Sequence, residues 1–167
     1  LCLDRQGHPT GPSPFRGHHI HVVISLQGVR GSHPANNNRL DLFLRHWRNR
    51  CGEAGTPDFV VCPGVVDSRR GYGVTQAYVS CIDSLKEEQM PANVIIFEDE
   101  ARIISGEVCG GNYTQALRSA PPSTFLVLLA GHAYRYGCRR HGPLRELKRS
   151  YGMYAVAVPY ENLHTLR

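Results

Sequence analysis

The chain has 167 residues, of which 41% are hydrophobic and 20% are charged, which is the composition of one globular domain and not of a disordered segment. Its longest apolar run, residues 125–131, is far shorter than the roughly 20 residues of a membrane helix, so the sequence predicts no membrane span. The net charge of +5 either favours polyanionic partners, such as nucleotide phosphates, nucleic acid or anionic lipid, or serves only solubility.

The spacing of the six cysteines argues against a zinc site or a redox-active site and does not decide the cellular compartment. None forms a Cys-x-x-Cys pair, so neither a zinc ribbon nor a thioredoxin-like site is expected. The even number would permit three disulfides in the secretory pathway, whereas the apolar surroundings of Cys62 and Cys81 favour buried free thiols. Both the secretory pathway and the cytoplasm therefore stay open. Because the chain begins at Leu1 and not at Met, we expect a fragment or processed form, which leaves room for a lost signal or membrane anchor.

Turn residues and hydrophobic patterns divide the chain into an arm and one domain. Residues 1–17 are rich in Pro and Gly and are predicted to be a flexible arm, with the domain in residues 18–167. Short apolar runs predict strands at 21–26, 58–62, 93–97, 124–129 and 151–158. Helical spacing and turn residues predict helices at 39–50, 73–88, 112–119 and from 160 onward, with a loop and a turn of helix at 139–149. Strands that alternate with helices predict an α/β fold with a mostly parallel central sheet flanked by helices.

Three acidic residues, Glu98, Asp99 and Glu100, directly follow the third predicted strand. Ligands of such sheets sit beyond the carboxyl ends of the strands, which is where these carboxylates lie. In an extended segment Glu98 and Glu100 share a face, and two like charges at short range repel unless a cation lies between them. Mg²⁺ and Mn²⁺ prefer a few carboxylates together with substrate phosphates, so the triplet predicts a site for a divalent metal and a nucleotide diphosphate. A solvated acidic turn is the alternative.

Two further segments are candidates for nucleotide contacts. Asp67 and Arg70 lie in the loop after the second predicted strand, and Gly73 opens the next helix, where glycine allows close backbone approach and a helix N-terminus attracts phosphate. Arg39 heads the first predicted helix, from which its guanidinium would reach a pyrophosphate or a nucleobase. The chain has no Gly-x-Gly-x-x-Gly, no P-loop and no Gly-x-Ser-x-Gly, so dinucleotide-cofactor, ATPase and serine hydrolase interpretations have no support.

In pattern and order, residues 21–167 resemble the glycosyltransferase family that contains the bacterial lipooligosaccharide galactosyltransferases and the collagen galactosyltransferase domains. The family opens with a Val-Ile-Ser-Leu-like strand and an Arg-headed helix, to which residues 23–26 and Arg39 correspond, and continues with an Asp-containing loop and a Gly-led helix. A hydrophobic strand ending in Glu-Asp-Asp follows, and late in the domain comes a Gly-x-x-Ala-Tyr-like strand with a helix; residues 94–100, 151–156 and 161–163 are similar to these.

The resemblance implies a GT-A-like (Rossmann-like) fold and the metal-dependent transfer of a hexose from a nucleotide sugar, with UDP-hexose as the first candidate, to a hydroxyl of a glycan or protein. Glu98, Asp99 and Glu100 would bind Mn²⁺ or Mg²⁺ against the diphosphate. The implied nucleotide-sugar contacts are Arg39, Asp67, Arg70, Gly73 and Glu98. No catalytic residue is assigned. The family often continues with acceptor-site residues, so the domain is expected to be truncated at its C-terminus.

Two other functions are consistent with the sequence. A non-catalytic glycosyltransferase-like binding module is favoured by two departures from the family pattern: Glu100 replaces an Asp, and Ala77-Tyr78 stand where the family carries a Ser-His pair. A basic nucleic-acid-associated domain is suggested by the Arg-rich segments 39–50 and 135–149. Neither segment interleaves aromatics in the pattern of single-strand binding, so nucleic acid is the less favoured partner.

Overall fold

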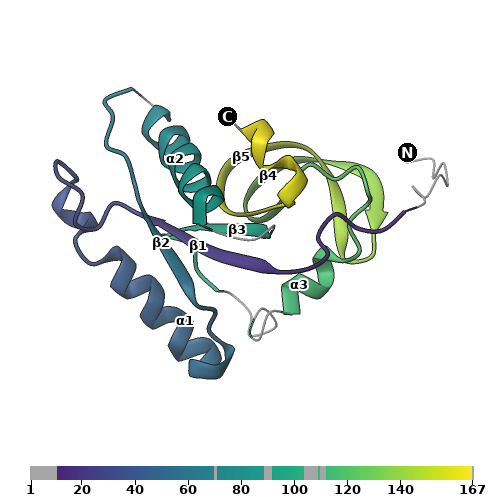
Figure 1. The fold of residues 1–167 in the computed structure, drawn as a ribbon, viewed down its shortest axis with the longest axis horizontal. Coiled ribbons are helices and arrows are strands. Elements are labelled where there is room, and N and C mark those ends of the chain that lie inside the picture. Colours follow the sequence, from purple (N-terminus) through teal and green to yellow (C-terminus); the bar gives the residue numbers. More distant parts are fainter. Residues whose placement is uncertain (1–10, 70, 89–91, 104–108, 110–111, 167) are drawn as a thin grey trace.

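The computed structural model of the chain describes residues 11–69, 71–88, 92–103, 109 and 112–166. Within these residues it is an α/β protein with one mixed sheet of five strands flanked by helices (Figure 1). The predicted α/β class is therefore confirmed. The prediction of a mostly parallel sheet was wrong in its proportion, because two of the four strand pairs are antiparallel.

The strands follow the order β2-β1-β3-β5-β4 across the sheet. β1 lies between β2 and β3 and is parallel to both, while β5 is antiparallel to β3 and to β4. The five strands are β1 His19–Ser25, β2 Phe59–Pro63, β3 Asn93–Glu98, β4 Val127–His141 and β5 Leu144–Val158. Each contains or overlaps one of the apolar runs that predicted it.

Helices cover both faces of the sheet (Figure 1). Phe43 and Trp47 of α1 pack with Ile95 and Phe97 of β3 on one face, and α2 packs on the other against Val94 and its neighbours. This division follows from the strand repeat, since successive side chains of β3 point to opposite faces. The helical elements are α1 Arg39–Gly55, which breaks at Gly52, α2 Tyr72–Glu88, α3 Asn112–Leu117, and the 3-10 helices Pro34–Asn36 and Tyr160–Leu166.

The predicted arm ends earlier than residue 17. Phe15 is fully buried in the core on the α1 face, and the Ser13 hydroxyl donates a hydrogen bond of 2.8 Å to the Leu117 carbonyl. Burying one Phe side chain stabilises the fold by about 2 kcal/mol, which outweighs the turn-forming preference of its Pro and Gly neighbours. Residues 1–10 lie outside the described part of the chain.

β4 and β5 form a long two-stranded ribbon, here called the β4–β5 ribbon (Val127–Val158), instead of the loop and helical turn predicted at 139–149. Its turn follows directly from the pairing of His141 with Leu144, and Gly142 in that turn has a φ of 59°. Repeated register shifts bend the ribbon, and its turn packs beside Ser119, at the end of α3. Cross-strand pairing overrides the helix preference of Leu, Arg and Lys in this segment.

Two disulfides lie within the described residues. Cys51 is bonded to Cys109, and Cys62 at the end of β2 is bonded to Cys81 of α2. The prediction that Cys62 and Cys81 are free thiols was therefore wrong. Both side chains are buried as expected, but the packing of α2 against the sheet brings them together, which no local pattern of apolar neighbours reveals.

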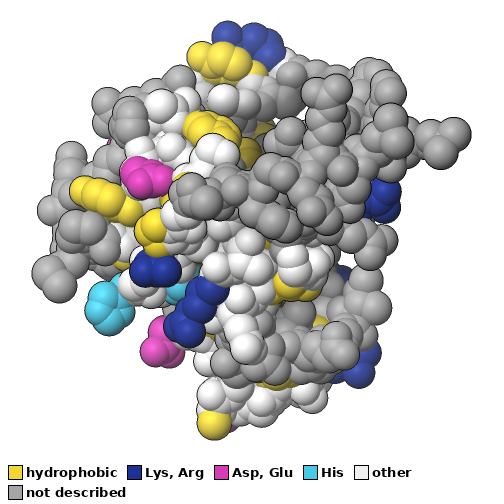
Figure 2. Space-filling model, turned by 90° about the vertical axis from the view of Figure 1, so that its right-hand side faces the viewer, with side chains coloured by type: hydrophobic (Ala, Val, Ile, Leu, Met, Phe, Trp, Pro, Cys, Tyr) yellow, Lys and Arg dark blue, Asp and Glu magenta, His cyan; other side chains and the backbone are white. Residues whose placement is uncertain are grey.

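Among the described helices, none combines the length and the apolar character needed to cross a membrane. On the side of the molecule that faces the viewer in Figure 2, the described hydrophobic side chains form small, separate groups. Three of the large exposed hydrophobic side chains among the described residues, Val66, Tyr72 and Val74, lie in and just before the start of α2.

Candidate functional site

The ends of three parallel strands meet at one edge of the sheet. The amide of Asp99, just after β3, donates a hydrogen bond of 3.1 Å to the carbonyl of Ile24 in β1. The amide of Gly64, just after β2, donates one of 2.6 Å to the carbonyl of Ser25. The segments that follow these strands therefore start side by side, at the edge where sheets of this kind bind ligands.

Arg39 joins two of the three predicted metal ligands. As the first residue of α1, it lies 3.8 Å from Asp99 and 3.3 Å from Glu100, measured between Nη1 and the carboxylate oxygens. The Asp99 side chain is only 7% exposed, whereas those of Arg39 and Glu100 are 37% and 41% exposed. The guanidinium thus links a buried carboxylate to one that solvent and ligands reach.

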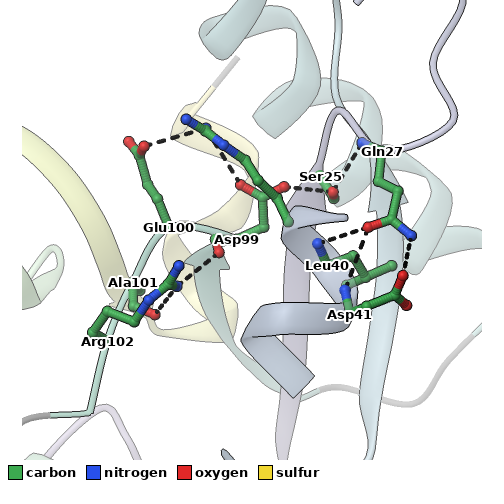
Figure 3. A network of polar contacts seen from close by, with 9 residues as sticks. Ser25, Gln27, Leu40, Asp41, Asp99, Glu100, Ala101 and Arg102 are labelled. Carbon is green, nitrogen blue, oxygen red and sulfur yellow. Dashed lines mark hydrogen bonds and ion pairs between the residues drawn. The ribbon is translucent and has the colours of Figure 1, made fainter. Parts of the chain in front are cut away.

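A polar network that was not predicted holds Asp99 and the start of α1 in place (Figure 3). The Ser25 hydroxyl donates a hydrogen bond of 2.5 Å to Asp99 and accepts one of 3.0 Å from the amide of Gln27. The Gln27 side-chain oxygen accepts from the amides of Leu40 and Asp41 at 2.9 and 3.3 Å, and its nitrogen donates to the Asp41 carboxylate at 2.9 Å. Gln27 therefore caps the N-terminus of α1 from a separate loop, because Asn38 at the N-cap position makes no side-chain cap bond.

Glu98 lies toward the other face of the sheet, where the Tyr78 hydroxyl of α2 donates a hydrogen bond to it. Burial raises the pKa of the Glu98 carboxyl to about 7, and the negative charges of Glu100 and Asp99 act in the same direction. Burial, together with the charge of Glu98, also raises the pKa of Tyr78 above its usual range. The prediction that Glu98 and Glu100 share a face of an extended segment was wrong, because β3 ends at Glu98 and the next two residues form a turn. Glu100 is nevertheless the neighbouring carboxylate with the larger effect on the pKa of Glu98.

Of the remaining predicted nucleotide contacts, Asp67 lies in the loop between β2 and α2, Gly73 lies in the first turn of α2, and Arg70 lies outside the described residues. Asp67 is held within its own loop by Arg69, whose side-chain nitrogens donate to its two carboxylate oxygens at 3.0 and 2.8 Å. The guanidinium of Arg69 in turn lies 3.5 Å from the centre of the Tyr72 ring. Gly73 has a packing role, because a Cβ at this position would lie 2.3 Å from the Val65 carbonyl oxygen.

The acidic residues do not form a ready three-carboxylate metal centre. In the described part of the chain, no three or more His, Cys, Asp or Glu side chains are grouped so that they could hold a metal ion. Asp99 is engaged by Ser25 and Arg39, and Glu98 by Tyr78. Mg²⁺ often uses only one or two protein carboxylates beside substrate phosphates, and the mutual repulsion of Glu98 and Glu100 suits such a cation. The metal site stays a prediction.

Comparisons with models of known protein families, with curated protein sequences and with solved structures find no match. The strand edge brings Arg39, Glu98, Asp99 and Glu100 together, while Asp67 is held by Arg69.

Sequence reasoning missed Ser25, Gln27 and Tyr78 as members of this site. Position 78 was noticed only as a departure from a family pattern. Ser25 carries a weak signal, since it is a polar residue that ends an apolar strand at the ligand-binding edge. Nothing local marks Gln27, because its partners are 13 and 14 residues further along the chain.

Proposed function

We propose that this protein is a glycosyltransferase that transfers a hexose from a nucleotide-diphosphate sugar to a hydroxyl group, with the GT-A-like arrangement of the galactosyltransferase family that the sequence resembles. The observation that carries the proposal is the pairing of Arg39 with Asp99 and Glu100 at the carboxyl ends of parallel strands. A guanidinium beside the partly exposed Glu100 carboxylate provides one group that binds phosphate directly and another that binds it through a divalent cation.

The side chains have different expected parts in donor binding. Glu100 is the more exposed of the two carboxylates that contact Arg39, so it would bind Mn²⁺ or Mg²⁺ against the diphosphate. Asp99 is buried and would orient Arg39 toward the diphosphate. A bound divalent cation would neutralise the charge that develops on the nucleotide diphosphate as the sugar leaves. UDP-hexose is the first donor to test, with a glycan or protein hydroxyl as the acceptor.

One observation favours a second function, a glycosyltransferase-like module that binds without catalysis. Arg39 already neutralises part of the charge of Asp99 and Glu100, so this cluster is stable without a metal ion. Such a module would bind a nucleotide sugar without turnover and without a strict metal requirement.

Thermal melting with Mn²⁺ and UDP or GDP, each alone and combined, tests donor binding. A ligand that binds only the folded protein raises the melting temperature, and we expect a rise that needs metal and nucleotide together. Glu100→Ala should abolish that rise and leave the melting temperature of the free protein unchanged. The matched control is Glu53→Ala, which removes a carboxylate that is 84% exposed near the end of α1.

Release of UDP from UDP-hexose in the presence of Mn²⁺ then separates the two functions. Turnover that Glu100→Ala removes supports the transferase. Nucleotide binding without turnover supports the binding module, and a melting temperature that no metal and nucleotide pair changes contradicts both.

A further inference from the structure

The net charge of the protein is concentrated in the β4–β5 ribbon. Residues 127–158 contain six basic residues and one acidic residue, a balance of +5 that equals the net charge of the whole chain. The remaining residues carry thirteen basic and thirteen acidic side chains and are neutral overall. The six basic residues of the ribbon are Arg135, Arg139, Arg140, Arg145, Lys148 and Arg149.

The register of the ribbon places like charges directly opposite each other. Arg135 pairs with Arg149, and Arg140 pairs with Arg145. Opposite positions of an antiparallel pair bring Cβ atoms within about 5.5 Å, and like charges there destabilise the pair. Two such pairs lie four residues apart on β5, a separation of about 13 Å. This placement suits a polymer that carries negative charges at regular intervals better than a single small anion.

The disulfides indicate which polyanion the protein meets. Cys51–Cys109 and Cys62–Cys81 need an oxidising environment, because cytosolic and nuclear proteins keep their thiols reduced. Nucleic acid is the abundant polyanion of reducing compartments. In oxidising compartments and outside the cell, chains of sulfated or carboxylated sugars present repeated negative charges.

We propose that the β4–β5 ribbon binds an anionic polysaccharide. β5 pairs with β3 next to the acidic edge, where Ala155 lies opposite Phe97, so the ribbon leaves the sheet beside the candidate site. Where the transferase proposal also holds, the bound polysaccharide is the acceptor, but the binding itself does not depend on transfer.

The experiment measures affinity for four probes at about 50 mM and about 150 mM NaCl: heparin, polygalacturonate, neutral dextran, and single-stranded DNA. We expect the two anionic polysaccharides to bind in a salt-dependent manner, and neutral dextran not to bind. The double variant Arg135→Gln with Arg149→Gln should lose roughly tenfold or more in affinity for heparin. Its fold should remain, because the change removes a like-charge pair, and its melting temperature checks this.

The matched control removes two exposed arginines of α1, by Arg45→Gln with Arg50→Gln, and so makes the same change in net charge. It should bind heparin like the original protein. Equal losses in both double variants would show a non-specific effect of net charge and overturn the proposal. DNA that binds more tightly than heparin at the same salt concentration would overturn the choice of polyanion. If the first double variant does not fold, Arg140→Gln with Arg145→Gln tests the second register pair in the same way.

The release of UDP from UDP-hexose tests the transferase activity separately from polysaccharide binding. Heparin binding that depends on the ribbon and persists in Glu100→Ala supports this proposal whether or not UDP-hexose is turned over.

Discussion

Ser25 and Asp99, 74 positions apart in the sequence, share a buried hydrogen bond of 2.5 Å that joins the end of β1 to the turn after β3. The same Asp99 carboxylate lies beside Arg39 of α1, so the Ser25 hydroxyl helps to set where that guanidinium is held. A hydroxyl group on one strand thus controls the geometry of a charged pair that belongs to two other elements.

Ser25→Ala should destabilise the protein by about 1–3 kcal/mol, because the buried Asp99 carboxylate loses a donor. Urea unfolding of Ser25→Ala, Asp99→Ala and the double variant measures the coupling between the two residues. We expect the double variant to lose less stability than the two single losses added together. Strictly additive losses would show that the hydrogen bond has no energetic role.

The stability of the protein should fall in mildly acidic solution because of His21. Burial, together with the charge of His19, lowers the pKa of His21 to about 4, whereas the unfolded chain titrates near the ordinary value of 6.5. The unfolded state therefore binds more protons between these two values, and the free energy of unfolding decreases as the pH drops from about 6.5 to about 4. This group contributes up to about 3 kcal/mol to the decrease.

Urea unfolding across this pH range, on the original protein and on His21→Phe, isolates that contribution. The variant should show a shallower dependence on pH, and the exposed-site control His33→Gln should not. An unchanged slope in His21→Phe would mean that other groups cause the acid sensitivity.

Gly73→Ala should destabilise the protein by about 2 kcal/mol or more, because the new Cβ would lie 2.3 Å from the Val65 carbonyl oxygen and the loop before α2 would have to shift. Gly71→Ala is the comparison. Its Cβ meets open space, so its cost is the left-handed backbone at φ +77°, about 1 kcal/mol. Thermal melting of both variants shows which one loses more stability. A larger decrease in melting temperature for Gly71→Ala would contradict the close approach at Gly73.

Replacing Cys62 and Cys81 together by Ala should lower the free energy of unfolding by about 3 kcal/mol, since the disulfide closes a loop between residues 19 positions apart. Urea unfolding with and without a reductant measures this. The reductant should lower the stability of the double variant less than that of the original protein, because only Cys51–Cys109 then remains among the described disulfides. An equal effect of the reductant on both proteins would argue against the Cys62–Cys81 bond.

The sequence predicted the regular elements well where apolar runs were short and bounded by turn residues. The strands β1, β2 and β3, the first residues of β4, the second half of β5 and the start of α1 at Arg39 follow from such local patterns. The direction of β5 does not, because a buried strand has the same composition in either direction. The basic segment 139–149, for which the sequence predicts a loop and a turn of helix, instead contains the end of β4, the turn and the start of β5, because the two strands pair across it.

The sequence predicted which charged residues belong to the candidate site, but it did not predict which residues they contact. The sequence places Glu98, Asp99 and Glu100 at a strand end, but β3 ends at Glu98, and the next two residues form a turn. Asp99 and Glu100 therefore meet Arg39 on one side, while Glu98 meets Tyr78 on the other. These partners are 20 to 61 positions away in the sequence, a distance over which sequence patterns give no information.

The two halves of the sheet should form at different speeds, because their pairings span very different lengths of chain. In the ribbon, His141 pairs with Leu144, so β4 and β5 can join from their turn outward. In the parallel half, His21 pairs with Phe59 and His19 with Asn93, and each pairing requires closing a long loop before any contact compensates for the lost chain entropy. β1 is the common partner in that half, so we expect its docking to be the slow step of folding. The strand edge that carries Arg39, Asp99 and Glu100 is then among the last parts of the molecule to assemble.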